Sequence, residues 1–274
     1  MAESYATEAI VLGSRRLGEA DRIVDLFTDS RGRVPTVVKG IRKVKSRWGG
    51  RLEPFTHLRV QVHEGRNLHT LTSADTIATH AALRDNPACL KPGLSVIEMI
   101  SRTTPEHHRK PRTYNLMLSF LNEMDRICLD AGSGRLTSLG AGSKGESAPS
   151  SNAPHEAAAP DRLRSHAASL ALGAQLKILL LAGFLPHLLS CAMCGAKADL
   201  TSFSARAGGA LCPGCLQDGF RIDPGSLEAM ILLLERPLSA VPDLKIGEVQ
   251  RRQIRRAVRE ICEYHLGVRL RVEL

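Results

Sequence analysis

Four cysteines between residues 191 and 215 constrain this 274-residue chain more than any other feature. They form two C-x-x-C pairs separated by seventeen residues: Cys191, Cys194, Cys212 and Cys215. Each pair can direct two sulfurs at one centre, and four thiolates then complete a tetrahedral zinc site with no open position. The segment 191–215 is therefore predicted to be a zinc knuckle whose Zn²⁺ is structural.

The cysteines and a nearby histidine have alternative roles. Two dithiol redox sites are one alternative, but neither pair opens a helix after a strand, as a thioredoxin-like site would. A catalytic zinc is disfavoured because four sulfurs leave no position for water. His187 is interpreted as a residue at a helix end, with a ligand role as the alternative. Cys89, Cys128 and Cys262 lie in apolar, helical patterns, so we expect them in the core.

Residues 6–75 have the pattern of an all-β domain. Runs of β-forming residues separated by turn signals predict five short strands, at 6–12, 22–28, 34–39, 57–63 and 68–73. Five strands in so short a segment, with one long loop, favour a closed barrel of the OB type. An SH3-like barrel and a small sandwich are the alternatives.

From Ala81 onward the apolar residues change to helical spacing. The pattern predicts helices at 91–102, 113–130, 161–184, 226–235 and 249–266. The segment 131–160 differs, because twenty-two of its thirty residues are Ala, Gly, Ser, Thr or Pro. Such a segment buries too little apolar surface to offset its ordering entropy, so we expect a disordered insertion. The chain is thus predicted to be α+β, with an OB-fold domain at 1–80 and a helical domain at 81–274 that carries the insertion and the zinc knuckle.

A basic stretch from Arg31 to Arg51 holds eight Lys or Arg residues and no Asp or Glu. Its second half, 40–50, is a glycine-bounded loop that cannot bury its charges. Such a loop favours a polyanionic partner, so we predict that DNA is contacted by Lys39, Arg42, Lys43, Lys45, Arg47 and Arg51. The alternative is an ordinary solvated surface.

A tryptophan within this stretch and a second basic cluster each have more than one interpretation. Trp48, the single tryptophan, is also assigned to the DNA site, where it could stack on an unpaired base; filling the barrel is the alternative. A second cluster lies on the last predicted helix: Arg251, Arg252, Arg255, Arg256 and Arg259. We interpret it as the solvent face of an amphipathic helix, with an auxiliary DNA track as the alternative.

The sequence lacks the common catalytic and membrane motifs. The sequence contains no Walker loop, no G-x-G-x-x-G after a strand, no G-x-S-x-G and no H-E-x-x-H, so no enzyme activity is expected. No apolar signal region follows Met1, and the longest apolar run, Ile178–Leu189, is too short to span a bilayer. We therefore expect a cytoplasmic protein with no membrane partner.

Several blocks carry a family resemblance. In the N-terminal part they are TEAIVL at 7–12, GEADRIV at 18–24, the basic residues around Lys39-Gly40 and 45–47, and LEPF at 52–55. In the C-terminal part they are LLAGFLP at 180–186, which runs into the cysteine pairs, and YHLG at 264–267. Together they resemble the RecO family of bacterial recombination-repair mediators over about 1–130 and 161–274.

The resemblance implies a function as well as a fold. It implies an OB fold, a helical domain with a zinc knuckle, and no catalysis. It also implies binding to single- and double-stranded DNA, annealing of complementary strands and work with RecR. With RecR, a member would load the recombinase RecA onto DNA coated by single-stranded-DNA-binding protein. The insertion departs from the family's usual compactness. From the residues alone, a sequence-specific regulator that reads DNA with its zinc ribbon and a thiol redox enzyme are the competing hypotheses.

Overall fold

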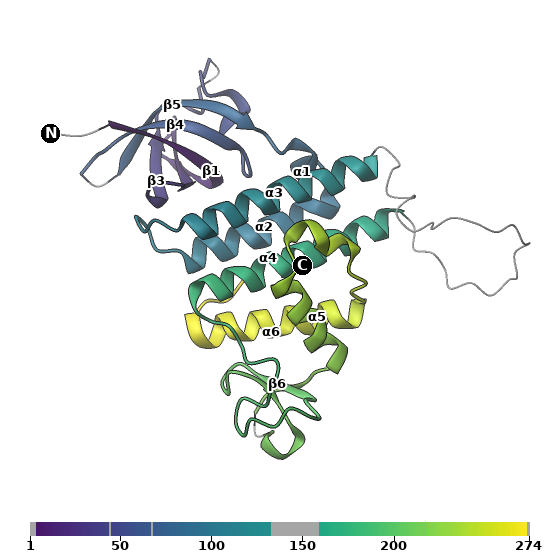
Figure 1. The fold of residues 1–274 in the computed structure, drawn as a ribbon. Coiled ribbons are helices and arrows are strands. Elements are labelled where there is room, and N and C mark those ends of the chain that lie inside the picture. Colours follow the sequence, from purple (N-terminus) through teal and green to yellow (C-terminus); the bar gives the residue numbers. More distant parts are fainter. Residues whose placement is uncertain (1–3, 44, 67, 133–158, 217, 273–274) are drawn as a thin grey trace, which may run out of the picture.

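The computed structural model describes residues 4–43, 45–66, 68–132, 159–216 and 218–272. The described chain forms three regions in a row: a β-barrel, a stack of helices and a small sheet that carries the four cysteines (Figure 1). The predicted α+β architecture is therefore confirmed. The predicted insertion at 131–160 lies outside the described residues, except for its ends, which continue the flanking helices.

The N-terminal region is a closed five-stranded barrel with the strand order β1-β2-β3-β5-β4. Its strands are β1 (Ser4–Leu17), β2 (Asp21–Thr28), β3 (Gly32–Val38), β4 (His57–His63) and β5 (His69–Ala78). Neighbours are antiparallel except for β3 and β5, which pair in parallel. This topology confirms the predicted OB fold. The strand predictions differ most at β1 and β5, both of which run past their predicted ends.

Both faces of β1 are covered, which explains its continuous apolar run. Ala9 and Val11 belong to the core inside the barrel, whereas Ile10 and Leu12 belong to a core that the barrel shares with the helices. Successive side chains of a strand point to opposite faces, so one strand can serve both cores. The barrel therefore keeps its own interior while one outer face packs on the helical region.

One end of the barrel is closed by the connection between β3 and β4. A 3₁₀ turn, η1 (Gly49–Leu52), places Leu52 and the preceding Trp48 in the barrel core, where both are buried. The indole Nε1 of Trp48 donates a hydrogen bond to the carbonyl of Lys39 at 3.1 Å. The connection is thus an apolar plug held by a satisfied polar group.

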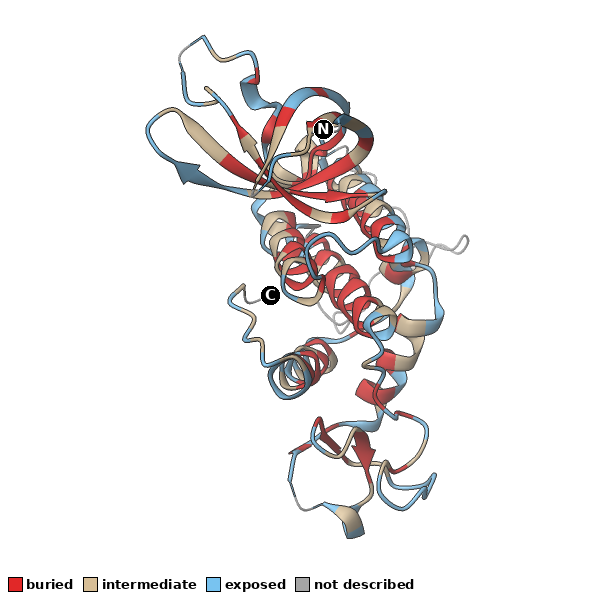
Figure 2. Ribbon diagram, turned by 90° about the vertical axis from the view of Figure 1, so that its left-hand side faces the viewer, coloured by how far each residue is buried: buried red, intermediate tan, exposed pale blue. Residues whose placement is uncertain are grey.

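The helical region is built around α4 (Ala159–Ala182). This helix packs against α2 (Pro87–Thr103), α3 (Pro111–Gly132), α5 (Pro224–Glu235) and α6 (Glu248–Leu266). Figure 2 shows that the buried residues line the inner faces of these helices. Within the described residues, one helical stretch, Pro160–Ala182, is long and apolar enough to cross a membrane, but 61% of its 18-residue apolar window is buried inside the structure, as in a core helix.

Local capping explains where the helices begin and end. The short α1 (Ala81–Asp85) was not predicted, and α2 begins earlier than predicted because the Asn86 side chain accepts a hydrogen bond from the Ala88 N–H at 3.0 Å. A further 3₁₀ turn, η4 (Leu238–Asp243), packs against α4. The last helix ends at Gly267, whose φ of 62° is the left-handed value that favours glycine.

The barrel is fixed to the helices by polar contacts around a shared apolar core. The Tyr114 hydroxyl and His57 Nε2 are hydrogen-bonded at 3.2 Å. Arg33 pairs with Glu106, in the connection between α2 and α3, at 2.9 Å. These contacts, together with the shared apolar core, fix the barrel on one side of the helical stack.

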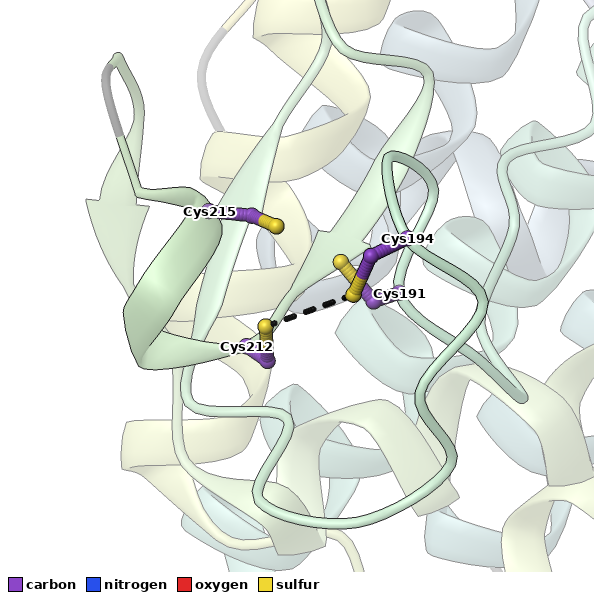
Figure 3. A group of neighbouring side chains, drawn as sticks. All are labelled: Cys191, Cys194, Cys212 and Cys215. Carbon is purple, nitrogen blue, oxygen red and sulfur yellow. Dashed lines mark hydrogen bonds between the residues drawn. The ribbon is translucent and has the colours of Figure 1, made fainter.

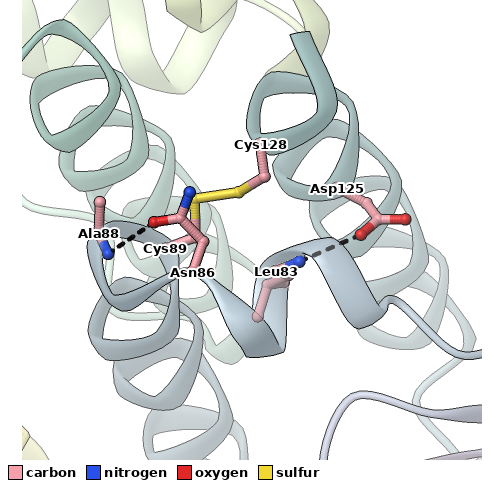
Figure 4. Close-up of a disulfide and its surroundings, with 6 residues drawn as sticks. All are labelled: Leu83, Asn86, Ala88, Cys89, Asp125 and Cys128. Atoms are coloured by element: carbon pink, nitrogen blue, oxygen red, sulfur yellow. Dashed lines mark hydrogen bonds between the residues drawn. A yellow bond between two sulfur atoms is a disulfide. The ribbon is translucent and has the colours of Figure 1, made fainter. Parts of the chain in front are cut away.

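Cys89 and Cys128 form a disulfide that joins α2 to α3 (Figure 4). Both side chains are buried, as expected for core residues, but the disulfide between them was not predicted. The local pattern showed only that each side chain faces inward, whereas the pairing of two cysteines 39 residues apart in sequence depends on how their helices pack together. Cys262 is free and buried, as expected.

The cysteine module (residues 187–221) is a three-stranded antiparallel sheet with the order β7-β6-β8. Its strands are β6 (Ser202–Ser204), β7 (Gly209–Leu211) and β8 (Phe220–Arg221). The backbone of His187 bridges to Gly209, where a Cβ would lie 2.1 Å from the His187 carbonyl oxygen. Only glycine permits this approach.

Candidate metal centre and nucleic-acid interface

The four predicted metal ligands converge in the cysteine module (Figure 3). The Sγ atoms of Cys191, Cys194, Cys212 and Cys215 all lie within 4.8 Å of one another. The Sγ atoms of Cys194 and Cys212 are 3.7 Å apart. Tetrahedral zinc with Zn–S bonds of about 2.3 Å places its sulfurs about 3.8 Å apart. The donor set therefore fits a metal ion of this kind, and His187 is outside the cluster.

Two tight turns aim the sulfurs at one point. In the first pair, the Gly195 N–H donates to the Cys191 carbonyl at 2.9 Å, and Gly195 has a φ of 76°. In the second pair, the Cys215 N–H donates to the Cys212 carbonyl at 3.1 Å, within the 3₁₀ turn η3 (Pro213–Cys215). Each turn involves only neighbouring residues, so the spacing of the cysteines alone was sufficient to predict that the four sulfurs would converge.

The clustered thiols also change one another's protonation. Backbone N–H groups of Cys212 and Cys194 donate to the Cys191 sulfur and lower its pKa to about 6. Side-chain hydrogen bonds with Cys194 and Cys212 raise the pKa of Cys215 to about 12. Neighbouring thiolates repel one another, and a divalent cation between them removes this penalty. The electrostatics of the cluster therefore favour a bound cation.

The basic loop (residues 39–51) lies on the outside of the barrel plug. The six basic side chains assigned to DNA are all exposed: Lys39, Arg42, Lys43, Lys45, Arg47 and Arg51. Across the part of the chain that the structure describes, none of the six is paired with a carboxylate. Arg42 donates to the Glu19 carbonyl at 2.8 Å and Arg47 to the Thr72 carbonyl at 3.0 Å. These acceptors are neutral, so the positive charge of the loop stays uncompensated.

The first arginines of the same basic stretch are used inside the protein. Arg31 forms an ion pair with Glu64, and Arg33 pairs with Glu106 at 2.9 Å. Both arginines are partly buried. The available cationic surface therefore begins at Lys39, after the end of β3.

Trp48 is not part of this surface. Its side chain is 3% exposed and packs in the barrel core. The Arg47 guanidinium lies 4.6 Å from the centroid of its ring. Stacking on a base requires a free aromatic face, so the burial corrects the expectation that Trp48 contacts DNA. Filling the barrel, the alternative, is the role that the structure shows.

The β1–β2 hairpin also carries exposed arginines that were not among the predicted DNA contacts. The hairpin lies beside the basic loop, because the Arg42 N–H donates to the Ala20 carbonyl at 3.0 Å. Arg15 and Arg16 are exposed on the hairpin, and Arg22 is the register partner of Arg16. The first strand was expected to end before Arg15, so these cations had no assigned place. A longer strand prediction would have found them.

The arginines of α6 divide into two groups. Arg251 was expected on the solvent face, but it is 8% exposed and pairs with Glu248 at 2.8 Å. A second guanidinium nitrogen of Arg251 donates to the Ile246 carbonyl. This arginine therefore stabilises the start of the helix and corrects the prediction at that position. The other four arginines of the cluster line a groove beside β8.

A closed OB barrel with an exposed cationic loop, joined to a helical region with a four-cysteine module, defines the structural class. Comparisons with known proteins agree with this class. Residues 1–80 match the family described as "Recombination protein O N terminal", and residues 161–273 match "Recombination protein O C terminal".

Several relatives are similar over most of their length. A "DNA repair protein RecO" from Nocardioides sp. is 35% identical over 219 residues, which cover 78% of this chain and 75% of that protein. One from Rubrobacter xylanophilus is 30% identical over 262 residues, covering 92% and 89%. One from Bifidobacterium longum is 29% identical over 267 residues, covering 96% and 94%. The chain belongs to the RecO family of DNA repair proteins.

Proposed function

We propose that this protein is a non-enzymatic mediator of recombinational repair. It binds single- and double-stranded DNA, anneals complementary strands and, with RecR, loads RecA onto DNA coated by single-stranded-DNA-binding protein. It acts in the cytoplasm, at the nucleoid. The observation that carries the proposal is the basic loop, whose exposed cations face no carboxylate within the described residues. Family membership supports the repair role.

The basic loop suits a partner that is recognised by charge. Its base is anchored by buried Trp48 and Leu52, so DNA binding need not order the whole connection. The buried indole leaves the loop without an aromatic platform, so phosphate contacts should dominate binding over base contacts. Binding of this kind is independent of sequence, and screening of phosphate charge allows two strands to approach. Annealing follows from the same contacts.

The cysteine module is proposed to hold structural Zn²⁺ through Cys191, Cys194, Cys212 and Cys215. The metal would supply cross-linking, because four sulfur ligands leave no place for a substrate. The module contacts the last helix, where His265 Nε2 donates to the Ala205 carbonyl at 3.1 Å. The metal thereby supports the helical region.

Two competing functions have less support. A sequence-specific regulator would read bases with the cysteine module, but Lys197 and Arg206 are the only cations between 192 and 211. A strong preference for one duplex in competition binding would favour the regulator. A thiol redox enzyme would use two separate dithiols, whereas all four sulfurs converge here. The zinc content per chain distinguishes the redox hypothesis from a zinc site, because the redox hypothesis predicts reversible disulfides in place of bound metal.

Replacing four loop cations tests the DNA site. The variant R42A/K43A/K45A/R47A should weaken DNA binding and slow annealing of complementary strands. Each lost phosphate contact should flatten the slope of log K against log salt by about 0.9 on duplex DNA, so four contacts should flatten it by about 3–4. The matched control removes four exposed cations elsewhere, in K91A/K197A/R236A/K245A. An unchanged slope would reject the loop as the site.

An annealing assay with coated strands tests the mediator role. Complementary strands are coated with single-stranded-DNA-binding protein and mixed with this protein, with and without RecR. We expect wild-type protein to anneal the coated strands, and RecR to be required for RecA filaments to form on them. Wild-type protein that anneals bare but not coated strands would contradict the mediator proposal and leave DNA binding intact.

A further inference from the structure

A groove beside α6 gathers arginines at a second place on the molecule. Its volume is about 530 Å³, and it lies between α6, β8 and the C-terminal segment 268–272. Among the residues that the structure describes, its lining contains no Asp or Glu and five arginines: Arg221, Arg252, Arg255, Arg256 and Arg259. The groove is therefore a cationic site that the repair function described above does not use.

Tertiary contacts build the groove. The Glu98 carboxylate of α2 accepts hydrogen bonds from the Arg271 N–H at 2.9 Å and the Val272 N–H at 2.8 Å. These bonds hold the C-terminal segment against the helical region, so that Leu270 and Val272 line the groove together with α6. Buried Phe220 contributes further apolar lining. The walls are thus fixed before any ligand binds.

Much of the groove's charge is uncompensated. Arg221, Arg252 and Arg259 are exposed, and none of these three is paired with a carboxylate of the described residues. Arg256 differs, because it pairs with Glu260 at 2.8 Å and its guanidinium lies 4.2 Å from the centroid of Phe220. Arg256 is therefore held in place by the protein, while the other three are free to bind an anion.

The spacing of these arginines favours a linear polyanion. Arg252 and Arg259, two of the three arginines without a carboxylate partner, lie seven residues apart on one side of α6, or about 10.5 Å along the helix. Guanidinium groups bind phosphates through two parallel hydrogen bonds, and a phosphodiester chain repeats its charge at regular intervals. A tightly bound acidic peptide would also need an open apolar pocket for an anchoring side chain. Phe220, the largest apolar side chain of this lining, is already covered by Arg256, which leaves Val258, Leu270 and Val272 as its smaller apolar residues.

We propose that the groove beside α6 binds the phosphate backbone of a second nucleic-acid strand while the basic loop holds the first. The inference rests on the proposed function. Figure 1 shows α6 on the side of α4 that faces away from the barrel, so the two cationic sites lie on separate surfaces. One chain can then hold two strands at once, which is the arrangement that annealing needs.

The charge-reversal variant R252E/R259E tests the proposal in the full-length protein. Two non-complementary oligonucleotides carry donor and acceptor dyes, and energy transfer reports both strands on one protein. We expect first-strand affinity to stay within about twofold, and second-strand affinity to fall about tenfold or more. The salt slope of second-strand binding should flatten by about 1.4, or about 0.7 for each contact. Arg256 is left intact because it packs on Phe220.

The control R236E/K245E makes the same change in net charge at exposed positions outside the groove. Equal second-strand binding by the two variants would overturn the proposal. So would a variant that keeps its second strand but loses binding to a polyglutamate peptide, a result that assigns the groove to an acidic polypeptide. If the charge reversal lowers the thermal midpoint, R252Q/R259Q replaces it and must show the same loss.

The test also separates this inference from the function on which it rests. Wild-type protein that binds no strand refutes the proposed function and the second site together. Wild-type protein that binds one strand through the basic loop, and never a second, refutes only the groove. The loop variant R42A/K43A/K45A/R47A should still bind one strand through the groove. Loss of that strand when R252E/R259E is added would support the groove as a binding site directly.

Discussion

The barrel and the cysteine module are both small β-structures, yet they are stabilised in different ways. The barrel closes five strands around an apolar core of its own. The module has strands of only two or three residues, and its buried aromatics, Phe203 and Phe220, belong to the core shared with the helices. Sheets so short are not stable alone. The barrel can therefore be stabilised by strand pairing and apolar burial, whereas the module needs its four sulfur ligands for stability.

Loss of metal binding should have the largest effect and should be confined to the module. In C191S/C212S two of the four ligands are lost, and structural zinc binding of about 10–16 kcal/mol is free energy of folding. We expect zinc content to fall and amide hydrogen exchange to become fast at 191–221, while residues 4–78 stay protected. The control M193S changes an exposed residue in the same turn. A variant whose module stays protected without metal would show that the comparison is wrong.

Replacing the barrel plug should have the converse effect. Trp48→Ala removes a buried side chain and should lower the unfolding free energy of the barrel by about 3–5 kcal/mol, measured by urea denaturation. Exchange at 191–221 should stay unchanged. Trp48→Leu keeps an apolar but smaller side chain without an aromatic ring, so its folded form should bind DNA as the wild type does. A stacking role would instead cost about 1–3 kcal/mol of binding, and that loss would contradict the burial assigned to Trp48.

The smallest effect should come from the contact between barrel and helices. Burial lowers the pKa of His80 below its usual 6.5, although Asp125, with Oδ2 3.7 Å from Nδ1, partly opposes the shift and His57 adds to it. The unfolded chain then takes up a proton that the folded chain does not. Stability is therefore full above about pH 6.5 and decreases as the pH falls toward the folded-state pKa.

His80→Asn tests this contribution, because asparagine tolerates the left-handed backbone at this position, where φ is 46°. Urea denaturation at a series of pH values between 7 and 5 should show a flatter pH dependence for the variant than for the wild type. The control H108N removes an exposed histidine in the connection between α2 and α3. Parallel pH profiles for H80N and wild type would show that His80 does not limit the stability of the junction.

The elements that could be predicted have strong local signals. Strand β4, His57–His63, has the predicted bounds because one of its faces is apolar and the other is not. The end of β1 was missed because Arg15 and Arg16 are exposed and carry no burial pattern. The five-residue helix α1 was missed because it is too short to show a helical period. The basic loop could be predicted because a run of Lys and Arg without Asp or Glu is visible in the sequence itself and does not depend on contacts with distant residues.

The sequence by itself determined the properties that a few neighbouring residues encode: strand and helix periods, the metal-ligand spacing of the cysteines and the excess charge of the basic loop. Tertiary structure alone decided that Trp48 faces inward, that Cys89 meets Cys128, and that Arg251 pairs while Arg252 lines a groove with Arg221. The physical reason is the distance along the chain over which each effect acts. Periodicity and turn geometry act over one or two turns of chain, whereas burial, disulfide pairing and shared walls depend on segments that meet only after folding.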